Sequence, residues 1–253
     1  MTDWNNLHRE IWYWAEQGRT ATFWWRDDDA IAPDAKLDHL LAVAAETTTP
    51  VALAVIAGVA DPLLAERIAP AREVSVVQHG FAHANHAPEG QPQDEYGPER
   101  TVAERLAELA EGRQRMMRLP RFVPVLVPPW NRLPHDLLAH LPAIGLQGVS
   151  AWGPRPCSQP APGVRQVNVH VDLMDWNTRR FCGHERGLGQ MINHLRARRL
   201  GTVDTSEPTG LMTHHAFHGP GGWAFLVELL RQTRPRPGIR WLSAGEAFAQ
   251  PPP

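Results

Sequence analysis

Short apolar runs alternate with longer amphipathic segments along most of this chain, and this alternation constrains the fold more than any other feature. The order strand, helix, strand favours parallel strands covered by helices. About eight such units predict an α/β fold built as a (β/α) barrel of mostly parallel strands. The expected strands are Ala21–Arg26, Val51–Ile56, Val74–Gln78, Val123–Val127, Gln147–Ser150, Val164–Val169, Gly210–Thr213 and Gly238–Leu242. The expected helices are Leu37–Glu46, Leu63–Ala71, Glu99–Leu119, Arg186–Leu200 and Trp223–Thr233.

Length and composition indicate one domain over residues 1–253, because 253 residues with 43% apolar content can bury one sizeable core. The net charge of −2 and the pI near 6.7 give no basic footprint for nucleic acid. The chain has no secretory signal and no apolar run long enough for a transmembrane helix, so we expect a cytoplasmic protein. Four tryptophans, Trp12, Trp14, Trp24 and Trp223, are expected in the core.

Polar motifs follow the predicted strands at the points where the strands end. Asp27–Asp29 ends the first strand, His79 follows the third, Pro128 follows the fourth, and His214 follows the strand Gly210–Thr213. The carboxyl ends of barrel strands form one face, and catalytic residues gather there. The sequence therefore predicts a single site on that face. The loop of residues 79–98, rich in proline, glycine, histidine and asparagine, is long enough to be functional.

Three consecutive aspartates raise one another's pKa unless a cation or an arginine neutralises them. One interpretation makes one of them a metal ligand and another a general base. The alternative is a helix N-cap with solvated neighbours. His79 and His83 are four residues apart, a spacing that places two imidazoles on one face of a helical turn. Loop histidines that only form hydrogen bonds are the alternative there.

Other candidates belong to the substrate pocket or to proton transfer. His214 follows an apolar strand, a place that suits proton transfer, because unperturbed histidines exchange protons near neutrality. A metal-free polar cluster at the barrel rim is the alternative there. Asp175 could orient a neighbouring side chain while Trp176 walls a pocket. Pro129, Trp130 and Asn131 lie in a proline-rich turn that suits a binding groove as well as a bend.

Five ordered motifs resemble the catalytic domain of the polysaccharide deacetylases of carbohydrate esterase family 4, also known as NodB-homology domains. The motifs are Asp28-Asp29-Ala30, His79-x3-His83, Pro128-Pro129-Trp130, Asp175-Trp176 and Leu211-x-x-His214, and they span residues 21–218. The resemblance implies a distorted (β/α) barrel of about seven repeats.

The resemblance also implies roles for individual residues. Asp28 would be the general base and His214 the general acid, while Asp29, His79 and His83 would hold a divalent metal. Leu211 and Trp176 would shape the pocket for the acetyl methyl group, and Asp175 would belong to the charge network that supports the catalytic pair.

Two departures from the family pattern indicate an atypical subgroup. The first motif contains three aspartates, so the pair of base and ligand is either Asp28/Asp29 or Asp27/Asp28. We prefer Asp28/Asp29, because the small Ala30 then takes the place of the family's glycine. The family also has an arginine just before the two prolines of its third motif, where this chain has Val127. Arg26 and Arg132 are the candidates to replace it, and a base whose pKa is tuned in a different way is the alternative.

The resulting hypothesis is a metal-dependent hydrolase that removes an acetyl group, most readily the N-acetyl group of an amino sugar or glycan precursor. Histidine with carboxylate suits Zn²⁺, and Co²⁺ or Ni²⁺ would fit the same ligands. The expected partner is a carbohydrate or an acetylated small molecule. Two alternatives remain open: a metal-dependent or metal-free hydrolase of another amide, and a catalytically inactive barrel that binds glycans. The sequence gives no indication of the oligomeric state.

Overall fold

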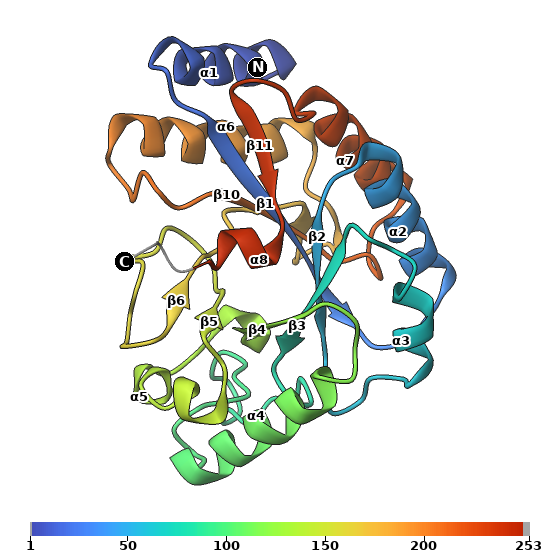
Figure 1. The fold of residues 1–253 in the computed structure, drawn as a ribbon, viewed down its shortest axis with the longest axis vertical. Helices are drawn as coiled ribbons and strands as arrows, with labels where there is room; N and C mark the ends of the chain where they lie inside the picture. Colours follow the sequence, from blue (N-terminus) through green and yellow to red (C-terminus); the bar gives the residue numbers. More distant parts are fainter. Residues whose placement is uncertain (1, 250–253) are drawn as a thin grey trace.

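A computed structural model describes residues 2–249 of the chain (Figure 1). The strands are β1 (Ala21–Ala30), β2 (Val51–Val55), β3 (Val74–His79), β4 (Phe122–Val127), β5 (Gly148–Val149), β6 (Arg165–Gln166), β7 (Val171–Asp172), β8 (Met174–Asp175), β9 (Arg180–Phe181), β10 (Thr209–Thr213) and β11 (Ile239–Leu242). The helices are α1 (Trp4–Glu16), α2 (Ala35–Thr47), α3 (Leu63–Ile68), α4 (Val102–Met116), α5 (His135–Leu138), α6 (His184–Leu200), α7 (Pro220–Gln232) and α8 (Ala244–Ala247), with short 3₁₀ turns η1 (Pro129–Asn131) and η2 (Leu141–Ile144).

The main sheet is parallel throughout and has the order β6-β5-β4-β3-β2-β1-β10-β7, with β11 paired to the start of β1. The segment of residues 165–172 joins the two ends of this order. It pairs with β5 through β6 at its beginning and with β10 through β7 at its end. We call it the closing segment. The strands that form the barrel wall are thus β1 to β5, the closing segment and β10. This arrangement confirms the expected α/β barrel of mostly parallel strands.

Alternation along the strands separates two cores, because successive side chains of a strand point to opposite faces. In β1, Phe23 and Trp25 pack outward against the helices, whereas Trp24 points into the barrel. The same division places Ala52 of β2 inside and Leu53 outside. Helix α8 covers one end of the barrel interior, where Phe248 meets Trp24 edge to face with ring centroids 5.6 Å apart. The other end is left for polar side chains.

Each expected strand and helix is present, with shifted ends, but the sequence analysis missed α1. This helix begins at an N-cap, Asp3, whose carboxylate accepts the main-chain N–H of Asn6 at 3.0 Å. Its buried side chains include Leu7, Ile11 and Trp14, spaced as in an amphipathic helix. The prediction that Trp12 lies in the core is wrong, since its side chain is 54% exposed. It lies on the opposite, exposed face of the same helix.

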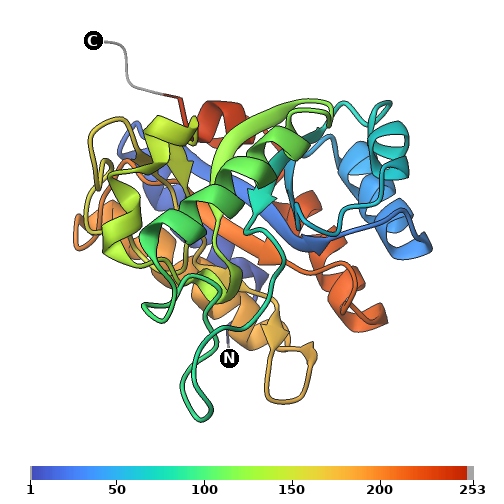
Figure 2. The same ribbon diagram turned by 90° about the horizontal axis from the view of Figure 1, so that it is seen from below.

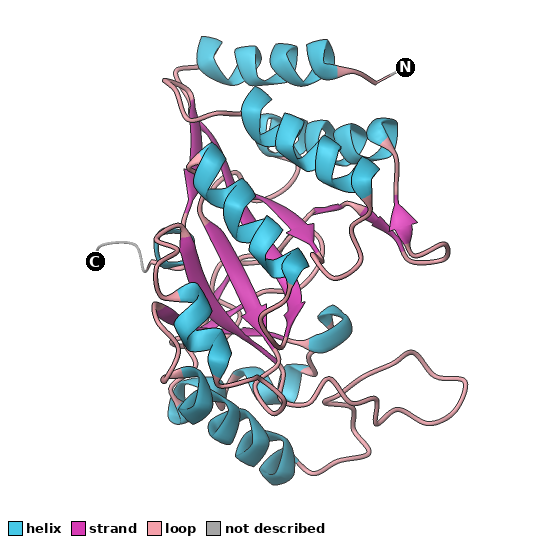
Figure 3. Cartoon of the chain, turned by 90° about the vertical axis from the view of Figure 1, so that its right-hand side faces the viewer, coloured by secondary structure: helices cyan, strands magenta, loops and turns pink. Residues whose placement is uncertain are grey.

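The helices surround the sheet, and long loops project from one end of the molecule. Figures 2 and 3 show the loop between β3 and α4 and the hairpin of β8 and β9 extending from the same side. That side carries the carboxyl ends of the parallel strands, so the loops surround the predicted site. The helices formed by residues 2–249 are too short or too polar to span a lipid bilayer.

Candidate metal centre and active site

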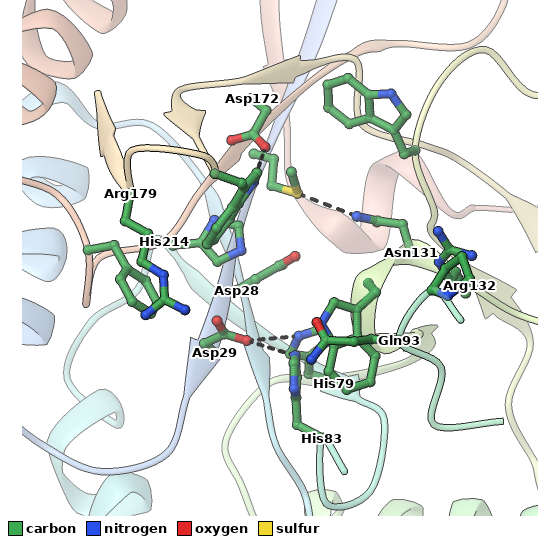
Figure 4. A pocket seen from close by; sticks show the side chains of 16 residues that line it. Asp28, Asp29, His79, His83, Gln93, Asn131, Arg132, Asp172, Arg179 and His214 are labelled. Atoms are coloured by element: carbon green, nitrogen blue, oxygen red, sulfur yellow. Dashed lines mark hydrogen bonds and ion pairs between the residues drawn. The ribbon is translucent and has the colours of Figure 1, made fainter. Parts of the chain in front are cut away.

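A cavity of about 980 Å³ opens at the carboxyl ends of the strands (Figure 4). Its lining combines carboxylates, histidines, arginines and aromatic rings that come from distant parts of the chain. The lining residues are Asp28, Asp29, His79, His83, Pro92, Gln93, Trp130, Asn131, Arg132, Trp152, Asp172, Trp176, Arg179, Met212, His214 and Phe217. The size is that of a pocket for a small molecule or a few sugar rings.

The geometry of β1 assigns different surroundings to its three aspartates. Arg26 and Asp28 continue the inward side of the strand, so Asp27 points outward and is fully buried. At Asp29 the pairing with β2 shifts register, and the residue has a φ of 70°. This bulge breaks the alternation, so that the consecutive side chains of Asp28 and Asp29 both line the cavity. The structure thus brings together the pair Asp28/Asp29 rather than Asp27/Asp28.

Arg26 holds the carboxylate of Asp28 from inside the barrel. Its Nε donates to Oδ1 at 2.8 Å and its Nη2 to Oδ2 at 2.9 Å, a bidentate pair that is almost inaccessible to water. Arg26 also donates to the hydroxyl of Ser150 at 2.6 Å and to the amide oxygen of Asn131 at 2.8 Å. Of the two arginines considered as replacements for the one missing at Val127, Arg26 is therefore the one that pairs with Asp28.

Asp29, His79 and His83 place one ligand atom each within 4.8 Å of one another. Nε2 of His79 lies 3.0 Å from Oδ1 of Asp29, and Nε2 of His83 lies 3.4 Å from the same oxygen. Nδ1–H of His79 donates to the carbonyl oxygen of Val127 at 2.9 Å, because a carbonyl can only accept. That bond leaves Nε2 for the cavity, as in histidines that bind metals.

The charges of this group favour a cation among the three side chains. Burial opposes the charged form of His79, but the hydrogen bond to Asp29 and the two nearby carboxylates outweigh burial and raise the pKa of His79. Burial likewise raises the pKa of Asp29, yet the hydrogen bond from His79 and the neighbouring histidine charges hold that pKa well below its usual value. Partial burial and the charge of His79 lower the pKa of His83. A proton or a metal cation can supply the positive charge.

The histidine loop, which we define as residues 79–83, is not the helical turn that the spacing suggested. Gly80 and His83 have φ values of 56° and 54°, and these left-handed residues fold the loop so that both imidazoles face Asp29. A Cβ atom on Gly80 would come within 2.1 Å of Oε2 of Glu95. The two imidazoles do lie together, as their four-residue spacing suggested, but a loop with left-handed residues and not a helical turn brings them there.

Glu95 anchors the histidine loop, and the sequence analysis missed it. Its carboxylate is fully buried and accepts the main-chain N–H groups of Phe81 at 3.1 Å and Ala82 at 2.6 Å. It comes from the long loop that follows β3. A glutamate twelve residues beyond His83 in a loop rich in proline and glycine carries no local signal of this role.

His214 lines the cavity beside Trp176, whose ring centroid lies 4.6 Å from that of the imidazole. The indole N–H of Trp176 donates to Oδ2 of Asp172 at 2.7 Å, and the main-chain N–H of Met174 donates to Oδ1 at 2.8 Å. Burial raises the pKa of Asp172. Asp172 thus occupies the cavity beside Trp176, the position in which the sequence analysis expected Asp175.

Three residues expected to bind substrate do not line the cavity. Leu211 is fully buried in the outer core, because the side chains that share the inward face of β10 with His214 are those two residues apart. Met212 takes its place at the cavity wall. Asp175 lies in the β8–β9 hairpin opposite Arg180, and Pro129 is buried beneath the turn that presents Trp130 and Asn131.

Asp27 forms a polar network behind the cavity. Its carboxylate accepts the hydroxyl of Thr213 and the ring Nδ1–H and main-chain N–H of His215. Burial lowers the pKa of His215, but the charge and hydrogen bond of Asp27 outweigh burial and raise it. The network fixes the end of β10 directly beside His214.

A second cluster of ligand types, His170, His194 and Glu207, lies away from the cavity and does not suit a metal. The main-chain N–H of Gly210 donates to Nδ1 of His170 at 3.0 Å, so the neutral ring carries its proton on Nε2 and has no lone pair for a cation. The two imidazoles stack with centroids 3.4 Å apart. Burial lowers the pKa of His194 to about 2. The cluster is structural.

No protein-family model matches the sequence, and no curated protein matches it either. Solved structures do share the fold. A protein of Mycobacterium smegmatis described as a polysaccharide deacetylase superposes with a TM-score of 0.60 at 16% identity, over 89% of this chain and 87% of the other. The chitin deacetylase of Colletotrichum lindemuthianum gives 0.53 at 14% identity, over 92% and 89%. A family 4 carbohydrate esterase of Streptomyces lividans, in complex with acetate, gives 0.52 at 14%, over 84% and 86%.

Proposed function

We propose that this chain, which has the fold of the family 4 carbohydrate esterases, is a metal-dependent hydrolase that removes the N-acetyl group of an amino sugar. The supporting observation is the convergence of Asp28, Asp29, His79, His83 and His214 on one cavity from three separate segments of the chain. Similarity in fold alone would leave the activity open. The chemistry of the converging side chains carries the proposal.

Asp29, His79 and His83 would hold the metal, because they offer two imidazole nitrogens and a carboxylate oxygen around one point. Three protein ligands of this kind suit Zn²⁺, and Co²⁺ or Ni²⁺ fit the same donors. When bound, the cation supplies Lewis-acid polarisation of the acetyl carbonyl and lowers the pKa of water. The carbonyl of Val127 would keep the His79 ring oriented for this task.

Asp28 would act as the general base. Arg26 fixes its carboxylate in one orientation and balances its charge, while each oxygen keeps a lone pair for a further hydrogen bond. A water molecule between Asp28 and the acetyl carbonyl carbon would give a proton to Asp28 while the water oxygen attacks that carbon. Asn131 and Ser150 hold Arg26 in turn, so the base is supported from three elements.

His214 would act as the general acid. The carbon–nitrogen bond breaks when the amide nitrogen receives a proton, and His214 lines the cavity near Asp28 and Asp29 (Figure 4). Trp176 packs against the imidazole, and Asp172 holds Trp176 through the indole N–H. The products are a free amine on the sugar and acetate, with one water consumed.

The aromatic lining supports a sugar as the substrate. Trp130, Trp152, Trp176 and Phe217 line the cavity, and Trp152 and Trp176 are 46% and 45% exposed. Large exposed rings around a cavity usually mark a binding groove, because leaving them in water is unfavourable. The apolar faces of pyranose rings suit such surfaces. Met212 offers a short apolar contact for the acetyl methyl group beside His214.

Alanine substitutions of the metal ligands test the proposal. His79→Ala and Asp29→Ala should abolish both zinc uptake, measured by elemental analysis, and acetate release from N-acetylated chito-oligosaccharides. His86→Ala is the matched control, since His86 lies in the same loop but is exposed and outside the ligand group. Full acetate release by metal-stripped His79→Ala protein would refute metal dependence. A panel of N-formyl and O-acetyl substrates would separate an N-deacetylase from other hydrolases.

A further inference from the structure

Two arginines, Arg132 and Arg179, stand at the rim of the cavity and come from different elements. Arg132 follows the turn after β4, and Arg179 lies in the tip of the β8–β9 hairpin. Both are exposed and both line the cavity. Figure 4 shows them on opposite sides of the metal-ligand group, with Asp28 between them. A molecule that spans the cavity would meet at least one of them.

Neither guanidinium has an internal partner within residues 2–249. Among the other exposed arginines, Arg231 pairs with Glu46 and Arg240 pairs with Glu246, whereas Arg118 likewise has no such partner within residues 2–249. Arg132 and Arg179 form no ion pair and no side-chain hydrogen bond with the described part of the chain. Arg179 has a φ of 52°, a left-handed conformation that is uncommon for residues other than glycine and asparagine. The tip of the hairpin thus has an arginine at a position whose backbone conformation glycine would adopt with less strain.

The carboxylates on the cavity floor do not need these arginines. Arg26 already balances Asp28, and His79 or a metal balances Asp29. The rim therefore adds two positive charges above a floor whose charges are largely compensated. A cleft with low-dielectric walls focuses the electric field of such charges, and this field attracts anionic ligands into the cleft.

Each arginine follows a tryptophan of the cavity wall. Arg132 comes two residues after Trp130, and Arg179 comes three residues after Trp176. On both sides an aromatic surface for a sugar ring is thus joined to a guanidinium fork. Arginine binds the paired oxygens of phosphates and carboxylates through two parallel hydrogen bonds. The arrangement suits a sugar with an anionic substituent better than a neutral sugar.

We propose that the substrate is an acetylated amino sugar that carries an anionic oxygen group, a phosphate or a carboxylate, which one of the rim arginines, Arg132 or Arg179, binds while the other adds to the positive field at the cavity mouth. This inference rests on the proposed function for the acetyl group but not for the charge preference. Binding and turnover can therefore be tested separately.

Calorimetry on zinc-loaded Asp28→Asn protein measures binding without turnover. The probes are N-acetylglucosamine 6-phosphate, N-acetylmuramic acid and neutral N-acetylglucosamine, which separate a phosphate from a carboxylate preference. At low salt, at least one charged probe should bind roughly ten-fold or more tightly than the neutral one, since charge-assisted bonds are strong. Arg132→Gln and Arg179→Gln should each reduce this preference, and the double variant should abolish it. Arg118→Gln, an exposed arginine away from the cavity, should retain it.

The outcomes distinguish the two proposals. Equal binding of all three probes, undetectable binding of all three, or a preference that survives in the double variant would overturn the anionic substrate. Acetate release by the unsubstituted protein without any charge preference would overturn this inference alone. Charge-dependent binding with no acetate release from any probe would overturn the deacetylase and leave the anion site standing.

Discussion

Replacement of Arg26 by methionine should destabilise the metal-free protein severely, because it would strand a buried charge. The side chain of Asp28 is 3% exposed, and Arg26 supplies both of its hydrogen-bond donors within the barrel. Removing one partner of a buried ion pair costs about 3–5 kcal/mol, whereas replacing both partners costs much less. We therefore expect Arg26→Met to lose about 3–5 kcal/mol of unfolding free energy. The double variant Arg26→Met/Asp28→Asn should recover most of that loss.

Urea unfolding of the four proteins of this cycle, in buffer with a chelator, measures the coupling between the two side chains. The chelator matters because a bound cation would itself compensate Asp28. Arg105→Met is the control: Arg105 is also buried, but its partner Asp136 is 51% exposed and reaches water when left alone. The reasoning fails if Arg26→Met costs no more than Arg105→Met, or if the double variant is no more stable than the single one.

Three further predictions concern other parts of the site. Glu95→Gln should weaken zinc binding by roughly 10- to 100-fold, measured by competition with a chromophoric chelator, because the two N–H groups of the histidine loop donate to different carboxylate oxygens and glutamine replaces one of these with an NH2 donor; unchanged affinity would contradict the anchoring role. Met212→Ala and Leu211→Ala should each cost about 2–5 kcal/mol of stability, because both side chains are buried, but only Met212→Ala should raise the KM for acetylated substrate; a KM raised by Leu211→Ala and unchanged by Met212→Ala would contradict the assignment of their faces. The pKa of His215 is raised above 6.5 by Asp27, so the stability that His215 contributes should be full below about pH 6.5 and should fall as the pH rises through the raised pKa; a stability difference between wild type and His215→Gln that grows with pH would refute this sign.

The sequence predicted the strands well, because apolar runs such as Val51–Val55 and Val74–His79 are buried on both faces and read continuously. The three predicted histidines, His79, His83 and His214, line one cavity, since strand ends in a parallel barrel converge. What the sequence could not resolve were offsets of a single residue. The choice of Asp28/Asp29 depends on a bulge, and the choice between Leu211 and Met212 depends on which face of β10 is inward.

Contacts between distant segments were beyond the sequence for a different reason. Arg26 contacts Ser150 and Asn131, and Glu95 contacts the main chain of the histidine loop, only because the folded chain brings these groups together. Arg26 was a candidate because its neighbours in the sequence are the aspartates themselves. Glu95 had no such neighbour. Helix α1 was missed although Asp3 and the spacing of its buried residues were visible, so that omission could have been avoided.

The closing segment has a consequence for how the barrel forms. It is joined to β5 on one side and β10 on the other by only a few main-chain bonds, such as those from the N–H of Val167 to Val149 and of His170 to Gly210. Val149 and Gly210 lie far apart in the chain, so the barrel can close only after the other strands have paired. The amides of Val167 and His170 should thus be the last of the sheet to gain protection in pulsed hydrogen exchange and the first to lose it when the barrel reopens.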